Sequence, residues 1–127
     1  MESHSQQLNV IFVPYPTPGH IIPMIDTTRV FANHGVSVTI ITTQANALIF
    51  QKAIDSDFSS GYAIRTQVIQ FPSAQLGLPQ GVENIKSGTS QEMLGKISQG
   101  ISMLQDQIEV VLQDQQPERR LRIFSIK

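Results

Sequence analysis

The stretch from Val10 to Met24, Val-Ile-Phe-Val-Pro-Tyr-Pro-Thr-Pro-Gly-His-Ile-Ile-Pro-Met, decides the fold of this chain of 127 residues. Its first residues belong to a short apolar run, Leu8–Val13, whose β-branched and aromatic residues are typical of a strand covered on both faces. The prolines and the glycine between Pro14 and His20 exclude regular structure and predict a tight turn. A buried strand that ends in a tight turn is therefore the first predicted element.

A helix and a second strand follow this turn. The apolar residues from Ile21 to Ala32 have helical spacing, and Asn33-His34-Gly35 predicts the end of that helix. Pro23 is expected in its first turn, where a missing N–H costs nothing. The β-branched run Val36–Thr42 predicts the second strand. Strand, turn, helix and strand within about 35 residues form a βαβ unit, whose right-handed crossover makes the two strands parallel.

The chain then repeats this cycle in a weaker form. In order, the sequence predicts a short helix, a polar break, a third strand, a long surface loop and a long helix: Ala45–Ile54, Ser56–Gly61, Ile64–Phe71, Ser73–Gly88 and Ser90–Gln113. Thr89 and Glu92 have the spacing of a capping box at the start of the long helix. One face of this helix is apolar and predicts packing against the sheet, and Gly95 and Gly100 would allow a neighbour to approach closely.

The end of the chain changes character. Arg119–Lys127 carries four basic residues and no acidic one, whereas the residues before it carry five Lys or Arg against ten Asp or Glu. Leu121–Ile126 is apolar enough to form a fourth strand. Arg122 would then place a charge in a strand buried on both faces, which is costly unless the charge is paired. We therefore interpret residues 118–127 as a divergent basic tail.

Composition excludes several classes of protein. A net charge of −1 argues against binding nucleic acid by neutralising phosphates, and the absence of cysteine excludes disulfides, thiolate nucleophiles and cysteine metal sites. No apolar run approaches the roughly 18 residues that a membrane helix needs. Met1–Gln7, which we expect to be a flexible N-terminus, lacks the features of a signal peptide. The sequence predicts a soluble cytoplasmic protein with no nucleic-acid partner and no membrane span.

His20 is the residue of the turn that indicates chemistry. In an open parallel sheet, ligands bind beyond the carboxyl ends of the strands, and His20 follows the first strand at the N-terminus of the first helix. The helix dipole disfavours a charged imidazole at that place, so a neutral His20 is a candidate general base. The competing interpretation is a histidine that only caps the helix.

The other patterns considered predict no cofactor or metal site. The turn has a single glycine, Gly19, where a dinucleotide fingerprint needs three, and no Gly-Lys-Ser/Thr follows as in a Walker loop. His4 lies in the N-terminal start, and His34 is interpreted as a favourable charge at a helix end. No carboxylate pair or histidine cluster has the spacing of a metal site.

The quoted stretch strongly resembles the start of plant UDP-sugar-dependent glycosyltransferases, in which Gly-His-x-x-Pro lies within such a βαβ unit. The following segments carry the same resemblance: Phe31–Gly35, Val36–Thr43, Asn46-Ala47 with Phe50, Ile64–Pro72, Gly77–Pro79 and Met103-Leu104. The resemblance runs from Leu8 to Pro117, which is about the first quarter of a full-length member. The sequence of Ile64–Pro79 is similar to that of the family members that glycosylate triterpenoid saponins.

This resemblance implies a fold and a reaction. The implied fold is α/β, a partial Rossmann-like open parallel sheet of about four strands in the order 3-2-1-4, from the N-terminal portion of a two-domain GT-B type enzyme. The implied reaction is the inverting transfer of a hexose from a UDP-sugar to a hydroxyl of a plant secondary metabolite, a triterpenoid or flavonoid. His20 would be the general base. Thr17 and Gly19 would lie nearest the incoming sugar, and Tyr15 would line the acceptor pocket.

The sequence departs from the family pattern in two ways. An aspartate that orients the histidine would fall near Ile123, yet no carboxylate follows Glu118. The C-terminal domain that holds the UDP-sugar in the family has no counterpart among these residues. We therefore interpret residues 8–117 as a partial acceptor-binding domain that does not transfer sugar by itself.

Two further interpretations remain open. The chain could be a non-catalytic module that holds a small apolar molecule through Tyr15, the loop Ser73–Gly88 and the long helix, or that pairs with a full-length relative. It could also be a generic α/β domain in which His20 is only a cap. Under either interpretation the fourth strand would be a sheet edge with unpaired backbone groups, which predicts marginal stability.

Overall fold

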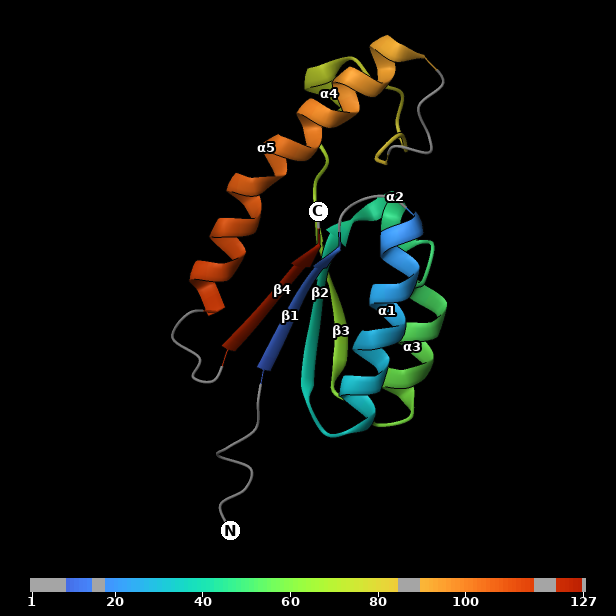
Figure 1. Cartoon of the computed structure of the whole chain (residues 1–127), viewed down its shortest axis with the longest axis vertical. Coiled ribbons are helices and arrows are strands. Elements are labelled where there is room, and N and C mark those ends of the chain that lie inside the picture. The colour runs from blue at the N-terminus through green and yellow to red at the C-terminus, as the bar shows by residue number, and fades with distance from the viewer. Residues whose placement is uncertain (1–8, 15–17, 85–89, 116–120, 127) are drawn as a thin grey trace.

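A computed structural model describes residues 9–14, 18–84, 90–115 and 121–126, which form one parallel sheet with flanking helices. The strands are β1 (Asn9–Pro14), β2 (Ser37–Thr43), β3 (Ile64–Ile69) and β4 (Leu121–Ile126). They lie in the order β3-β2-β1-β4, and each neighbouring pair is parallel (Figure 1). The predicted α/β class, the parallel pairing and the strand order are confirmed.

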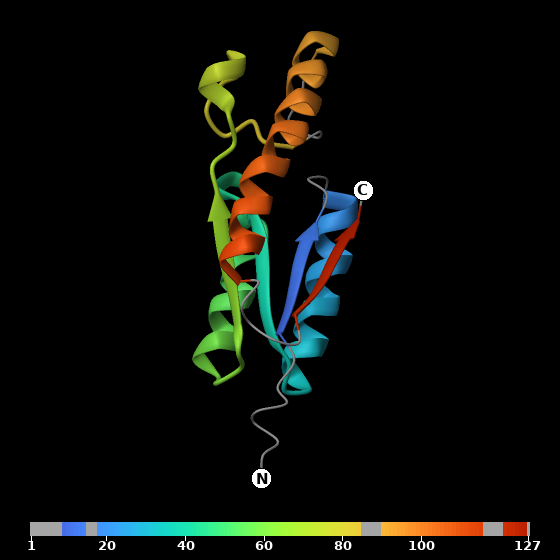
Figure 2. The ribbon, with the colours of Figure 1, turned by 90° about the vertical axis from the view of Figure 1, so that its left-hand side faces the viewer.

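Helices cover both faces of this sheet. The helices are α1 (Pro18–Asn33), α2 (Gln44–Ala47), α3 (Gln51–Ser59), α4 (Ser73–Leu76) and α5 (Gln91–Gln115). α1 and α3 lie on one face, and α5 crosses the other (Figures 1 and 2). The N-terminal half of α5 extends, together with α4, beyond the edge at which the strands end. Within the described part of the chain, no helix combines the length and the apolar character needed to cross a membrane.

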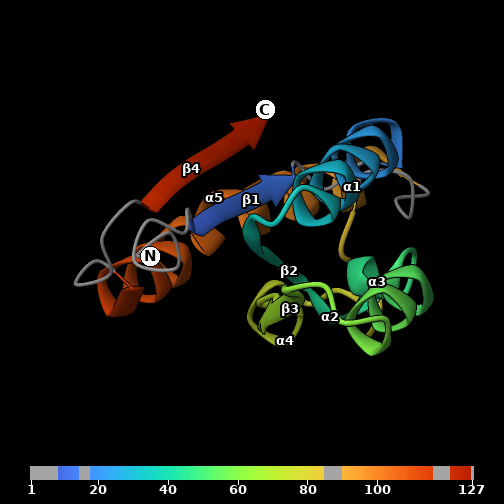
Figure 3. The same ribbon diagram turned by 90° about the horizontal axis from the view of Figure 1, so that it is seen from below.

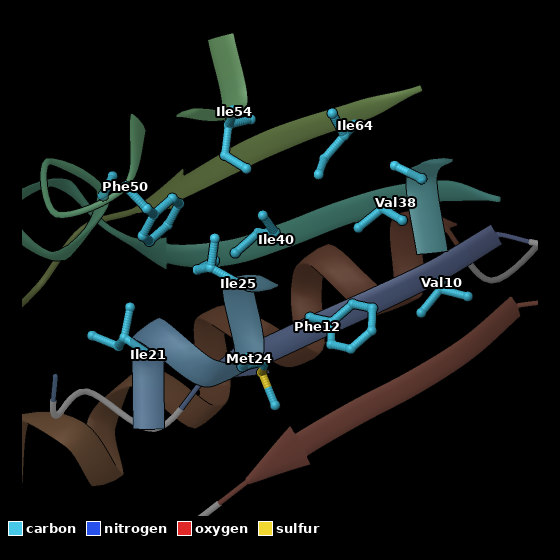
Figure 4. Close-up of a cluster of buried hydrophobic side chains, with 12 residues drawn as sticks. Val10, Phe12, Ile21, Met24, Ile25, Val38, Ile40, Phe50, Ile54 and Ile64 are labelled. Carbon is cyan, nitrogen blue, oxygen red and sulfur yellow. The ribbon is translucent and has the colours of Figure 1, made fainter. Parts of the chain in front are cut away.

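One core lies between the sheet and the pair α1 and α3 (Figure 4). Because side chains alternate between the two faces of a strand, every second strand residue points into it. Its buried members include Val10, Phe12, Ile21, Met24, Ile25, Val38, Ile40, Ile54 and Ile64. The rings of Phe12 and Phe31 meet edge to face, with centroids 5.4 Å apart. This core fixes α1 against the first two strands.

The second core lies between the opposite face of the sheet and α5. Ile11, Ile41 and Ile69 from the strands pack there with Ile97 and Leu104 of the helix. The predicted packing of the apolar helix face against the sheet is therefore confirmed. Viewed from the amino ends of the strands, α5 lies across the face opposite α1 and α3 (Figure 3).

Of the two glycines in α5, one is a contact site and the other is not. A Cβ atom added to Gly100 would lie 2.5 Å from Cζ of Phe71 and 2.9 Å from Cδ1 of Leu76, so the segment that contains α4 approaches α5 through this position. A Cβ added to Gly95 would meet nothing within 4 Å. The prediction of a close approach is confirmed for Gly100 and wrong for Gly95.

Three predicted helix boundaries differ from the structure. α1 begins at Pro18, so Pro23 lies beyond its first turn and cannot donate a bond to the carbonyl of Gly19. The single helix predicted over Ala45–Ile54 is two helices, and the second continues to Ser59 through the predicted polar break. The N-cap of α5 is Ser90, whose Oγ accepts a 3.1 Å hydrogen bond from the N–H of Met93. Thr89, the predicted cap, lies outside the described residues.

The segment Leu121–Ile126, predicted to belong to a basic tail, forms the edge strand β4. Arg122 is in register with Val10, and Ile123 is in register with Ile11, in the middle of β1. The residues level with the carboxyl end of β1 are Ser125 and Ile126. β4 carries no carboxylate at that end.

Candidate active site

The carboxyl ends of the parallel strands meet at one edge of the sheet, where α1 and α2 begin (Figure 1). β1 ends at Pro14 and α1 starts at Pro18, while α2 starts at Gln44, directly after β2. Ligands of open parallel sheets bind in the crevice outside the carboxyl ends of the strands. The edge is therefore the place in this fold to search for a site.

His20 lies in the first turn of α1, at the position that the sequence predicts. Its side chain is half-buried, and the neighbouring Gly19 is exposed. The next residue, Ile21, is fully buried in the core beneath the helix, so the first turn is held firmly against the sheet. Of the other predicted site residues, Tyr15 and Thr17 lie outside the described residues.

His20 lies among the first residues of α1, whose N–H groups have no partner within the helix. A neutral imidazole has one nitrogen that accepts a proton. His34, at the other end of α1, makes a different contact: its Nδ1 lies 2.8 Å from the carbonyl oxygen of Val30, and its side chain is exposed.

A buried polar network occupies the same edge of the sheet, next to the end of β2. Asn46 is 1% exposed, and its Nδ2 donates to Oγ1 of Thr43 at 2.9 Å and to the carbonyl oxygen of Glu83 at 3.1 Å. Its Oδ1 accepts a 2.7 Å bond from Nδ2 of Asn84. The network joins Asn46 of α2 to a loop 37 or 38 residues further along the chain.

The carboxylate of Glu83 completes this junction. Its Oε1 accepts a 2.7 Å hydrogen bond from the backbone N–H of Ala45, one of the donors in the first turn of α2 that has no partner within that helix. Glu83 and Asn84 are both buried. The sequence interpretation did not single out either residue, because neither belongs to a motif and both fall in a predicted surface loop. Asn46 appeared there only within the family resemblance.

The predicted long loop is anchored to α5 as well as to α2. Phe71 and Leu76 contact α5 at Gly100, and Leu78 is buried in the second core. The side-chain amide of Gln107 donates to the carbonyl oxygen of Gln70 and accepts from the N–H of the same residue. The chain from β3 to Asn84 therefore stands beside α5 and returns to the carboxyl edge of the sheet.

The described residues contain no group of three or more His, Asp or Glu side chains that could hold a metal ion. The site residue that the sequence predicts at this edge is His20, whose imidazole can accept a proton from a bound hydroxyl group, as general bases do.

Two curated plant enzymes share much of this sequence, while no protein-family model matches the chain. Soyasapogenol B glucuronide galactosyltransferase of Glycine max is 48% identical over 118 residues, which are 93% of this chain and 24% of that protein. Nuatigenin 3-beta-glucosyltransferase of Solanum aculeatissimum is 42% identical over 120 residues, with the same coverage of both chains. The chain spans about a quarter of the length of the curated relatives it matches.

Solved structures of plant glycosyltransferases share the fold. Glycyrrhiza uralensis UGT73P12, crystallised with glycyrrhetinic acid 3-O-monoglucuronide, matches with a TM-score of 0.80 and 44% identity over 87% of this chain and 22% of its own. Arabidopsis thaliana UGT89C1, crystallised with UDP-L-rhamnose, matches with a TM-score of 0.70 and 26% identity over 94% of this chain and 30% of its own.

Proposed function

This chain corresponds in sequence and fold to the N-terminal part of the plant UDP-glycosyltransferases, and on that premise we propose that it forms the acceptor side of such an enzyme. The reaction is the transfer of a hexose from a UDP-sugar to a hydroxyl group of a triterpenoid or a flavonoid. His20 takes the hydroxyl proton. The acceptor oxygen then forms the new glycosidic bond while the bond between the sugar and UDP breaks, with inversion, and UDP leaves.

The observation that carries this proposal is the place of His20. It lies in the first turn of α1, directly beyond the carboxyl end of β1, in a chain that is 48% identical to a saponin galactosyltransferase. A hydroxyl group is a poor nucleophile until a base can take its proton, and an imidazole nitrogen can accept that proton. Gly19, Thr17 and Tyr15 remain the proposed substrate-binding residues.

The relatives support the proposed acceptor class. The matched proteins from Glycine max, Solanum aculeatissimum and Glycyrrhiza uralensis are named for, or crystallised with, a sapogenin or a triterpenoid glucuronide. The relative from Gentiana triflora, an anthocyanin 3'-O-beta-glucosyltransferase, is 38% identical and extends the range to flavonoids. We place a triterpenoid first because the two most similar of these sequences are named for, or crystallised with, a triterpenoid glucuronide.

A fusion protein tests the role of His20. Residues 9–115 replace the matching N-terminal part of UGT73P12, and UDP release is measured with glycyrrhetinic acid 3-O-monoglucuronide as acceptor. We expect the fusion to turn over and His20→Ala to lower its kcat by about 100- to 10,000-fold, the usual contribution of a general base. His34→Ala, which changes the exposed histidine at the other end of α1, is the matched control. Equal rates for His20→Ala and His34→Ala would contradict the proposal.

The 127-residue chain by itself is proposed to bind acceptor without transferring sugar. The sequence of β4, Leu-Arg-Ile-Phe-Ser-Ile, offers no carboxylate to orient His20. Calorimetric titration with the same glucuronide, and a UDP-release assay on the pure chain, separate three cases. Saturable binding without UDP release supports the proposal. UDP release that His20→Ala abolishes would show a complete catalyst, and a flat titration with folded protein would remove the acceptor-binding role.

A further inference from the structure

We infer that Asn46 is a positioning residue, whose side chain holds the segment Glu83–Asn84 at the carboxyl edge of the sheet and thereby shapes the acceptor side. The acceptor part of this inference rests on the proposed function, whereas the docking part does not. No step of the proposed reaction uses Asn46, so its burial and its set of bonds call for a separate explanation.

The geometry of Asn46 is that of a linker between two parts of the chain. An asparagine amide has two donor hydrogens and an oxygen that accepts up to two bonds. Asn46 uses both hydrogens, toward Thr43 and toward the carbonyl of Glu83, and its oxygen accepts from Asn84. Donors and acceptors on both sides make the junction specific for an amide, because neither a carboxylate nor an aliphatic side chain could make all three bonds.

The linked segment has few alternative anchors of its own. Between Gly77 and Asn84 the described chain forms no helix or strand, and Gly77 and Gly81 both adopt positive φ angles. Leu78 and Val82 pack in the second core, whereas Glu83 and Asn84 are held by Asn46 and by the bond from Ala45 to Glu83. Loss of the Asn46 bonds would therefore free Glu83 and Asn84 while the part of the segment up to Val82 stays in place.

The location of the junction gives it a consequence for ligand binding. Thr43 ends β2, and His20 lies in the first turn of α1, beyond the end of the adjacent strand β1, so both lie at the carboxyl edge. A segment fixed to α2, which directly follows β2, forms part of the wall at this edge. Its position then affects the affinity for the acceptor, which binds at the edge in the proposed function.

Amide hydrogen exchange on the full 127-residue chain tests the docking. The reporter is the N–H of Ala45, which is protected only while Glu83 is in place, and the fold control is the N–H of Val38, bonded to the carbonyl of Ala63 at the other edge. We expect Asn46→Asp to speed exchange at Ala45 at least ten-fold more than at Val38. Asn33→Asp makes the same chemical change at an exposed site on α1 and should leave both rates within two-fold. Equal acceleration at Ala45 and Val38, or none at Ala45, would overturn the inference.

A second, milder variant keeps the inference testable if Asn46→Asp does not fold. Asn84→Ala removes one bond to Asn46 and leaves the two bonds that Asn46 donates. We expect it to speed exchange at Ala45 at least three-fold more than at Val38, and a ratio of one would again overturn the inference.

Acceptor titration then separates the two parts of the inference. With glycyrrhetinic acid 3-O-monoglucuronide as the probe, we expect the Kd of Asn46→Asp to exceed that of the unmodified chain at least five-fold, while Asn33→Asp binds as the unmodified chain does. An unchanged Kd in a variant whose Ala45 exchange is accelerated would refute the acceptor role of Asn46. If the unmodified chain binds no acceptor, the proposed function fails, and the exchange rates still decide whether Asn46 docks the segment.

Discussion

Arg29 on α1 and Asp57 on α3 form an ion pair through two hydrogen bonds, between the two helices that cover one face of the sheet. Nε of Arg29 lies 2.7 Å from Oδ2 of Asp57, and Nη2 lies 3.1 Å from Oδ1. The arginine side chain is 41% exposed and the aspartate side chain only 14%. The pair therefore ties together the two helices that cover the core beside β1, β2 and β3, and the aspartate has little water to replace its partner.

Removal of the arginine should destabilise the chain measurably. We expect Arg29→Ala to lower the free energy of unfolding by about 1 kcal/mol, because exposure of the arginine weakens the pair while the aspartate loses both bonds. Urea denaturation followed by circular dichroism measures this change. Lys52→Ala, which removes an exposed cation from α3, is the control and should change stability by less than about 0.5 kcal/mol. Equal effects of the two substitutions would show that the pair contributes nothing.

The contribution of Arg29 should not depend on pH near neutrality. The hydrogen bond to Asp57 raises the pKa of Arg29 above its ordinary value, which is already strongly alkaline. A group with a raised pKa in the folded state stabilises fully below its unfolded pKa and loses that effect only as the pH rises through the folded one. The stability difference between the unmodified chain and Arg29→Ala should therefore be the same at about pH 7 and about pH 9. A difference that shrinks by half between these two conditions would contradict the assignment.

The two glycines of α5 should respond to alanine in opposite directions. At Gly95, where an added Cβ meets nothing, alanine should stabilise the chain by about 1 kcal/mol through its higher helix propensity. At Gly100, the new methyl group would overlap the ring of Phe71 and a methyl of Leu76, so we expect a net loss of about 1 to 3 kcal/mol. Thermal unfolding of both variants measures the sign, and stabilisation by Gly100→Ala would rule out the close approach.

The side chain of Gln107 should hold the chain that leaves β3. It makes two hydrogen bonds with the backbone of Gln70, and both groups are near the surface. We expect Gln107→Ala to cost about 1 kcal/mol and to speed amide exchange at Gln70. Gln105→Ala, at an exposed position two residues earlier on the same helix, should do neither. Unchanged exchange at Gln70 in Gln107→Ala would show that the bonds are not maintained in solution.

Local patterns in the sequence were sufficient to predict the elements that position His20. The apolar run before Pro14, the prolines of the turn and the apolar spacing after His20 predict β1, the turn and α1, because strand and helix periods differ and turns require special residues. The place of His20 follows from that framework alone. The register of β4 does not: the family pattern places a carboxylate near Ile123, whereas the structure pairs that residue with Ile11, three residues before the end of β1.

The error in the boundaries of α2 and α3 has a physical cause. The break between α2 and α3 follows Ala47 and precedes the buried Phe50, and the extension to Ser59 crosses residues that are polar in composition but helical in the structure. Polar residues on the outer side of a surface helix are compatible with helix and with loop alike. Packing of Ile54 against the sheet, together with the ion pair of Asp57, decides between them.

The sequence by itself determined the βαβ unit, the parallel pairing of its two strands and the position of His20 at the carboxyl edge, because each depends on residues close together in the chain. Only the tertiary structure decided that Asn46 bonds to Glu83 and Asn84, that Ala45 is capped by a carboxylate 38 residues away, and that Gly100 receives Phe71. Those contacts depend on how the layers of the fold meet, and a buried polar group is stable only where the fold supplies its partner.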